Sequence, residues 1–83
     1  MATYVNEQAF FDWYSAAARR PEPNRFALLE EVLRQYAETG REEFALSEKE
    51  TVSGQRERFP FRYDDVGCCG ASTVFVYFGE EGA

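Results

Sequence analysis

Residues 26–46 have the sequence FALLEEVLRQYAETGREEFAL, and the hydrophobic period changes within this stretch. Before Gly40, apolar side chains recur at helical spacing and form a face about half the circumference wide. After Gly40 the period becomes two, because Phe44 and Leu46 alternate with small residues, and this is typical of a strand. Gly40 is well placed as the left-handed residue that ends a helix. The stretch therefore predicts a helix over 24–39 followed by a β-strand.

A second amphipathic segment precedes this one. Asn6 is a good N-cap residue, and an apolar face that includes Phe10 follows it at helical spacing. Phe11 falls at the edge of that face, toward solvent. Basic residues up to Arg20 suit the end of a helix, and the prolines that begin with Pro21 prevent its continuation. The connection to the next helix is short, which predicts an antiparallel helical hairpin.

Two further strands are predicted nearer the C-terminus. Aromatic residues alternate with other residues over 58–63, and apolar residues occupy both faces of a segment over 72–78. A two-residue Ser53-Gly54 loop would place Phe44 opposite Tyr63. The strands are expected to form one antiparallel sheet.

These elements predict a single α+β domain over residues 1–83. The expected architecture is a two-layer sandwich, in which an antiparallel helical hairpin packs on one face of a three-stranded antiparallel sheet. The residues expected to dominate the core are Phe10, Trp13, Phe26, Leu29, Leu33, Tyr36, Phe44, Leu46, Phe59, Phe61, Val74 and Val76.

The composition restricts the class of partner. The net charge is −6, which disfavours attraction to nucleic acid or to an anionic membrane and suits a basic protein surface. There is neither a signal-peptide pattern nor an apolar stretch near the roughly 20 residues of a membrane helix. The only two cysteines are adjacent and cannot connect distant parts of a fold, so a reducing, cytoplasmic location is expected.

Catalysis and cofactor binding are not expected. The chain has no histidine, so the commonest general base is missing, and it contains no nucleotide-binding motif. Structural zinc needs four ligands, and the adjacent Cys68 and Cys69 seldom both reach one ion. The sequence therefore predicts a protein that is not an enzyme and needs neither a metal nor a cofactor.

The outer face of the predicted sheet is one candidate binding surface. If the aromatic residues of 58–63 point to the helices, Arg58 and Arg62 point outward, and the last strand adds Phe75 and Tyr77. Such a mixture is enriched at protein interfaces, and it can also stack nucleic-acid bases. A third interpretation is a solvated face whose arginine stems cover apolar neighbours.

The acidic residues form a second candidate surface. Carboxylates spaced on a small scaffold can imitate backbone phosphates and occupy the nucleic-acid channel of another protein. The alternative is an ordinary charged surface that keeps the chain soluble. The acidic residues considered for partner binding are Glu48, Glu50, Asp64, Asp65, Glu80 and Glu81.

The functional hypothesis is a non-enzymatic protein-binding module that is a monomer or a weak homodimer. Its size, acidity and aromatic content suit a small inhibitor of a larger nucleic-acid-handling complex, of the phage anti-CRISPR or anti-restriction type. The alternatives are a nucleic-acid-binding domain that uses the outer sheet face and an accessory or structural subunit of a complex.

Overall fold

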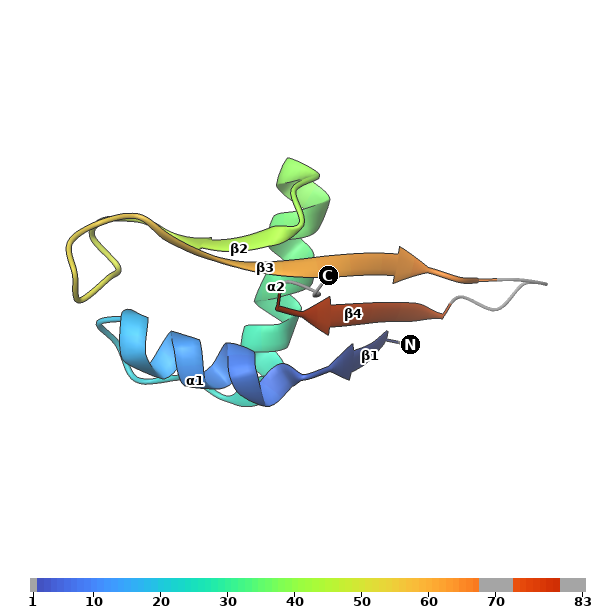
Figure 1. The fold of residues 1–83 in the computed structure, drawn as a ribbon, viewed down its shortest axis with the longest axis horizontal. Coiled ribbons are helices and arrows are strands. Elements are labelled where there is room, and N and C mark those ends of the chain that lie inside the picture. The colour runs from blue at the N-terminus through green and yellow to red at the C-terminus, as the bar shows by residue number, and fades with distance from the viewer. Residues whose placement is uncertain (1, 68–72, 80–83) are drawn as a thin grey trace.

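The structure, a computed structural model, describes residues 2–67 and 73–79. It is an α+β fold with two helices and a four-stranded mixed sheet in the order β1-β4-β3-β2 (Figure 1). The elements are β1 (Ala2–Val5), α1 (Glu7–Ala17), α2 (Arg25–Thr39), β2 (Glu43–Leu46), β3 (Glu57–Asp65) and β4 (Val74–Phe78).

The boundaries of α2 follow from its terminal residues, as the sequence predicted. The Asn24 side chain accepts a hydrogen bond of 2.8 Å from the backbone N–H of Ala27. Gly40 has φ 71°, and its N–H donates to the Tyr36 carbonyl at 2.8 Å. Both contacts satisfy backbone groups that a helix leaves unpaired at its ends.

The prediction of a three-stranded antiparallel sheet is wrong. Residues Ala2–Val5 form β1, which adds to the sheet edge parallel to β4, with Thr3 beside Phe75. Asn6 then starts α1 without a side-chain cap, at φ 63°, and its amide donates to the Phe78 carbonyl at 3.2 Å. A strand of four residues has too few positions to establish a period, and its partner is distant in the sequence.

The predicted antiparallel helical hairpin is also wrong, since α2 crosses the sheet steeply while α1 runs along the strand direction (Figure 1). The chain that leaves α1 is held by the connection between β2 and β3. Ala18 forms a β-bridge with Thr51, and the Arg19 N–H donates to the Glu50 carbonyl at 2.8 Å. The helix therefore ends at Ala17, before the predicted Arg20, and the chain extends before α2 begins.

The connection between β2 and β3 spans residues 47–56 and is longer than the predicted two-residue loop. Phe44 consequently pairs with Phe59, and the predicted pairing with Tyr63 is wrong. Thr51 is fully buried in this connection, and its hydroxyl donates to the Gln55 carbonyl at 2.7 Å. Loop length sets the register of a hairpin, and here the loop is anchored by α1.

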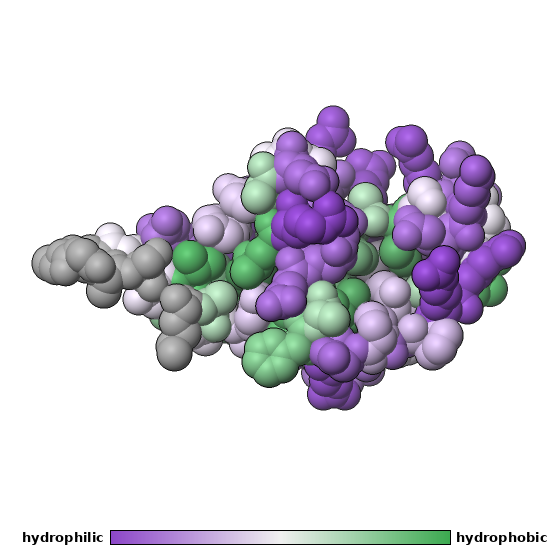
Figure 2. Space-filling model, turned by 180° about the vertical axis from the view of Figure 1, so that it is seen from behind, coloured by the Kyte–Doolittle hydropathy of each residue, from purple (hydrophilic) through white to green (hydrophobic). Residues whose placement is uncertain are grey.

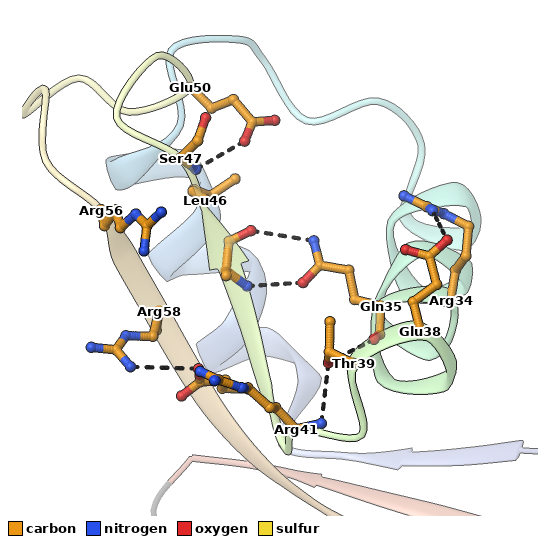
Figure 3. A pocket seen from close by; sticks show the side chains of 12 residues that line it. Arg34, Gln35, Glu38, Thr39, Arg41, Leu46, Ser47, Glu50, Arg56 and Arg58 are labelled. Atoms are coloured by element: carbon orange, nitrogen blue, oxygen red, sulfur yellow. Dashed lines mark hydrogen bonds and ion pairs between the residues drawn. The ribbon is translucent and has the colours of Figure 1, made fainter.

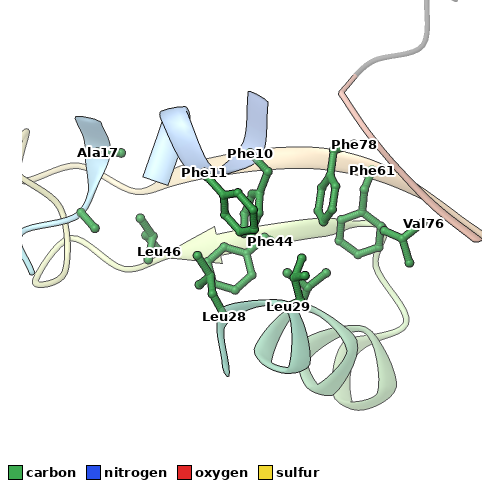
Figure 4. Packing of buried hydrophobic residues seen from close by; sticks show 12 residues of the cluster. Phe10, Phe11, Ala17, Leu28, Leu29, Phe44, Leu46, Phe61, Val76 and Phe78 are labelled. Carbon is green, nitrogen blue, oxygen red and sulfur yellow. The ribbon is translucent and has the colours of Figure 1, made fainter. Parts of the chain in front are cut away.

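The core lies between the helices and one face of the sheet (Figure 4). Six of the predicted core residues are buried, and five others are partly buried against them. Phe26 is 80% exposed, whereas Phe11 is 2% exposed, so both of these predictions are wrong. The buried residues are Phe10, Leu29, Phe44, Leu46, Phe61 and Val76, and the partly buried ones are Trp13, Leu33, Tyr36, Phe59 and Val74.

Helix orientation explains both errors. The buried residues of α2 are Leu28, Leu29 and Val32, and the centre of their arc lies about 110° from Phe26 at 100° per residue. Phe11 is buried because the start of α2 covers it, with the Arg25 guanidinium 4.7 Å from the centre of its ring. On the α2 side, hydrophilic residues cover the middle of the molecule, with hydrophobic residues beside them (Figure 2).

Candidate binding surfaces

The sheet face opposite the core carries a half-buried aromatic strip, which we define as Phe75 and Tyr77 with the exposed Arg62. Arg62 and Tyr77 are paired across β3 and β4, and the guanidinium carbon lies 4.3 Å from the ring centre of Tyr77. The rings of Phe75 and Tyr77 lie 6.1 Å apart, with their planes at 23°. Since alternate residues such as Val76 are buried, strand alternation directs this outer strip away from the helices.

Both positively and negatively charged residues surround the outer strip. Asp64 is paired with Phe75, and its carboxylate lies 4.0 Å from the Arg62 guanidinium. Arg58, also predicted for this face, lies 3.5 Å from the Glu43 carboxylate. Val5, beside Tyr77, extends the apolar part onto β1 and is 41% exposed. The outer strip is therefore an apolar centre with a charge-balanced rim.

The predicted acidic residues fall into separate groups. Glu48 and Glu50 lie in the connection before β3, whereas Asp64 and Asp65 end that strand. The nine residues of β3 span about 26 Å at 3.3 Å per residue, so the two groups lie at opposite ends of the strand. The remaining pair, Glu80 and Glu81, lies outside the described residues.

A groove that the sequence did not indicate lies between α2 and the β2–β3 pair, with a volume of about 720 Å³ (Figure 3). Helical periodicity places Arg34 on a solvent-facing surface of α2, and only the packing of α2 beside β2 brings it near the arginines of β3. The lining residues are Arg34, Gln35, Glu38, Thr39, Arg41, Glu43, Ala45, Leu46, Ser47, Glu50, Arg56 and Arg58.

The charges in the groove are largely compensated. Arg34 donates hydrogen bonds to Glu31 and Glu38 on its own helix. Arg41 and Arg58 lie 3.8 and 3.5 Å from the same carboxylate, that of Glu43. This pairing leaves little net charge to attract an anion, although four arginines line the groove.

The floor of the groove contains a contact that closes one edge of the sheet. The Gln35 side chain accepts a hydrogen bond of 3.0 Å from the Ala45 N–H and donates one of 3.2 Å to the Ala45 carbonyl (Figure 3). The carboxamide thus takes the place that a neighbouring strand's peptide would occupy. Since exposed strand edges invite pairing with other chains, this contact protects β2.

Two tyrosines have shifted acidities. Burial raises the pKa of Tyr4, and the nearby Glu30 carboxylate raises it further. Burial also raises the pKa of Tyr14, and Glu50 adds to that shift. Both shifts favour the neutral hydroxyl, and Glu30 is the charged group that acts on Tyr4 of β1.

Across 2–67 and 73–79, no cluster of three or more His, Cys, Asp or Glu is arranged to hold a metal ion. Cys68 and Cys69 lie outside the described residues. Neither described helix is both long and apolar enough to cross a membrane. No family model, curated protein or solved structure matches this chain.

Proposed function

We propose that this protein is a non-enzymatic protein-binding module and that the outer strip is its contact surface. The observation that carries the proposal is the Arg62 guanidinium over the Tyr77 ring, on the sheet face opposite the core and the helices (Figure 1). Tyrosine, phenylalanine and arginine are enriched at protein interfaces, and buried aromatic or arginine anchors supply most of the binding energy there. Phe75 and Tyr77 are the anchors in this proposal.

The net charge of −6 supports a basic partner. Complementary charge increases the rate of encounter and fixes the orientation of docking. A basic surface that normally holds nucleic acid is such a partner, and a chain of 83 residues bound there would block it sterically. The proposed role is therefore a small inhibitor of a nucleic-acid-handling protein or complex, of the anti-CRISPR or anti-restriction type.

Direct nucleic-acid binding is a second candidate, because aromatic side chains on an open sheet can stack bases. The pairing of Phe75 and Tyr77 next to Arg62 favours it. Against it, Asp64 and Glu43 lie within 4.0 Å of the two arginines that would contact phosphates. Nucleic-acid affinity depends mainly on such uncompensated cations, so the protein partner is preferred.

The proposal is tested by comparing Phe75→Thr/Tyr77→Thr with Phe26→Ser. Threonine suits a strand, and Phe26 is an exposed aromatic residue outside the outer strip. The wild-type protein is used to capture its partner from native cells, and the partner is then purified and titrated with each variant. The double variant should lose at least about ten-fold in affinity, as expected for two anchor residues. Phe26→Ser should bind as the wild type does.

Equal affinity of all three proteins for the purified partner would contradict the use of the outer strip. A gel shift with single-stranded RNA and DNA at low salt distinguishes the second candidate. Binding there that is lost in Phe75→Thr/Tyr77→Thr would favour the nucleic-acid interpretation.

A further inference from the structure

The two edges of the sheet differ in whether side chains hydrogen-bond to their outward-facing backbone groups. At the β2 edge, the Gln35 carboxamide pairs with both backbone groups of Ala45. Where β3 extends beyond β2, the Glu42 carboxylate accepts the Tyr63 N–H at 2.8 Å. Side chains therefore form hydrogen bonds with exposed backbone groups along this edge of the sheet.

The β1 edge is short but has no comparable side-chain cover in the part of the chain that the structure describes. Ala2–Val5 pairs with β4 on one side, and no described residue donates or accepts a hydrogen bond on its other side. In a parallel pair, alternate residues direct their N–H and C=O groups away from the partner strand. The segment ATYV also lacks the charge or proline with which natural edge strands prevent pairing.

We propose that β1 accepts an extended, basic segment of the partner protein as a fifth strand of the sheet. This inference rests on the proposed function, because it specifies how part of the partner binds. Main-chain hydrogen bonds to an exposed edge supply affinity in this mode, and alternate side chains supply specificity.

Charge complementarity supports a basic segment over a second copy of this chain. β1 has no charged side chain, but Glu7 follows it and the Glu30 carboxylate acts electrostatically on Tyr4. A second copy would bring another net charge of −6 against the first. Like charges that meet at an interface oppose association, whereas lysine or arginine opposite Glu30 favours it.

The alternation of side chains between the two faces of β1 specifies the residue pattern expected in the added segment. Thr3 and Val5 are exposed on the outer face, and Val5 lies beside Tyr77, so apolar β-branched residues of the added strand would extend the outer strip. Tyr4 points to the opposite face, where Glu30 acts on it. The expected segment therefore alternates valine or isoleucine with lysine or arginine.

The probe is a short synthetic peptide in which valine alternates with lysine and arginine. Its affinity for the full chain is measured by titration, and hydrogen exchange shows which backbone amides it protects. We expect new protection within Ala2–Val5 and none in β2. Two N-methylated peptides of the same sequence form a matched pair. One is methylated at the odd-numbered residues and the other at the even-numbered residues, so only one of them loses the N–H groups that face β1. One should lose about ten-fold or more in affinity, while the other should bind nearly as the parent does.

The charge component is tested with Glu30→Gln, and Glu38→Gln is the control on the same helix. Glu30→Gln should weaken peptide binding by a few-fold and Glu38→Gln should not, since Glu38 pairs with Arg34 beside the groove. Equal binding by both N-methylated peptides would overturn the inference, as would protection at β2. Protection of β1 that grows with protein concentration without peptide would also overturn it, in favour of a second copy.

The two proposals fail in distinguishable ways. If Phe75→Thr/Tyr77→Thr loses affinity for the purified partner but the synthetic peptide does not protect β1, the outer strip is still supported as the contact surface. The strand-addition inference is then wrong. If the partner binds that variant with unchanged affinity, the proposed contact surface is wrong whatever the peptide shows.

Discussion

Phe10 shows how much of the core depends on one residue. It is 0% exposed, its ring is stacked on that of Phe78 at 4.6 Å, and it meets Phe44 edge-on at 5.2 Å. Such a site joins α1 to β2, β3 and β4. The rings within contact distance are those of Phe11, Trp13, Phe44, Phe59 and Phe78.

Phe10→Ala should lower the free energy of unfolding by about 4 kcal/mol, because it removes a fully buried ring and leaves a cavity. Phe26→Ala is the matched control, since the same ring at 80% exposure should contribute within about 0.5 kcal/mol. Urea unfolding followed by tryptophan fluorescence measures both. Similar decreases in the free energy of unfolding for the two variants would contradict the burial of Phe10 and the exposure of Phe26.

At the scale of single residues, the sequence predicted the identity of most core positions but not the use of polar ones. Asn6 was expected to cap α1, yet its side chain is bound to the carbonyl of Phe78. The partner atom lies in a strand that only tertiary folding brings close, so local capping preferences could not reveal this contact.

At the scale of elements, Gln35 connects α2 to the edge of β2 that faces away from β3. Gln35→Ala removes both hydrogen bonds to Ala45 and should destabilise the fold by about 1–2 kcal/mol. It should also increase concentration-dependent association, since the edge becomes available for pairing. Gln8→Ala is the control, because the Gln8 amide bonds only to Asp12 on its own helix. Urea unfolding and analytical ultracentrifugation measure the two effects, and a monomer of unchanged stability would contradict the protective role.

Element prediction succeeded where the signals were local. The bounds of α2 follow from Asn24 and Gly40, and the sequence contains both. It failed for β1 and for the end of α1, because these depend on a pairing with β4 and on a bridge to Thr51. Such long-range contacts leave no period or cap in the sequence itself.

In the molecule as a whole, the described acidic residues that were considered for partner binding are divided between two ends. The described structure measures 45 × 28 × 23 Å, and the two acidic pairs lie toward opposite ends of β3, which is about 26 Å long. That separation exceeds the screening length of about 8 Å at physiological salt, so the two ends act nearly independently. Each end therefore adds a local field of its own to that of the overall net charge of −6.

This division predicts different effects for two variants with the same charge change. Asp64→Lys/Asp65→Lys should slow association with the basic partner about ten-fold, because Asp64 adjoins the outer strip. Glu48→Lys/Glu50→Lys should leave the rate nearly unchanged. Stopped-flow association with the purified partner at two salt concentrations measures both. Equal slowing by the two variants would mean that total charge, and not the outer strip, directs binding.

By itself, the sequence determined the fold class, the ends of α2, most of the core and the outward alternation of Arg62, Phe75 and Tyr77. These properties depend on local periods and on the alternation of side chains along a strand. The tertiary structure alone decided the fourth strand, the burial of Phe11 in place of Phe26, the groove of arginines and the contrast between a closed and an open sheet edge. The physical reason is that each of these depends on how separate elements pack, and the packing angle of α2 is not encoded in any single stretch of the chain.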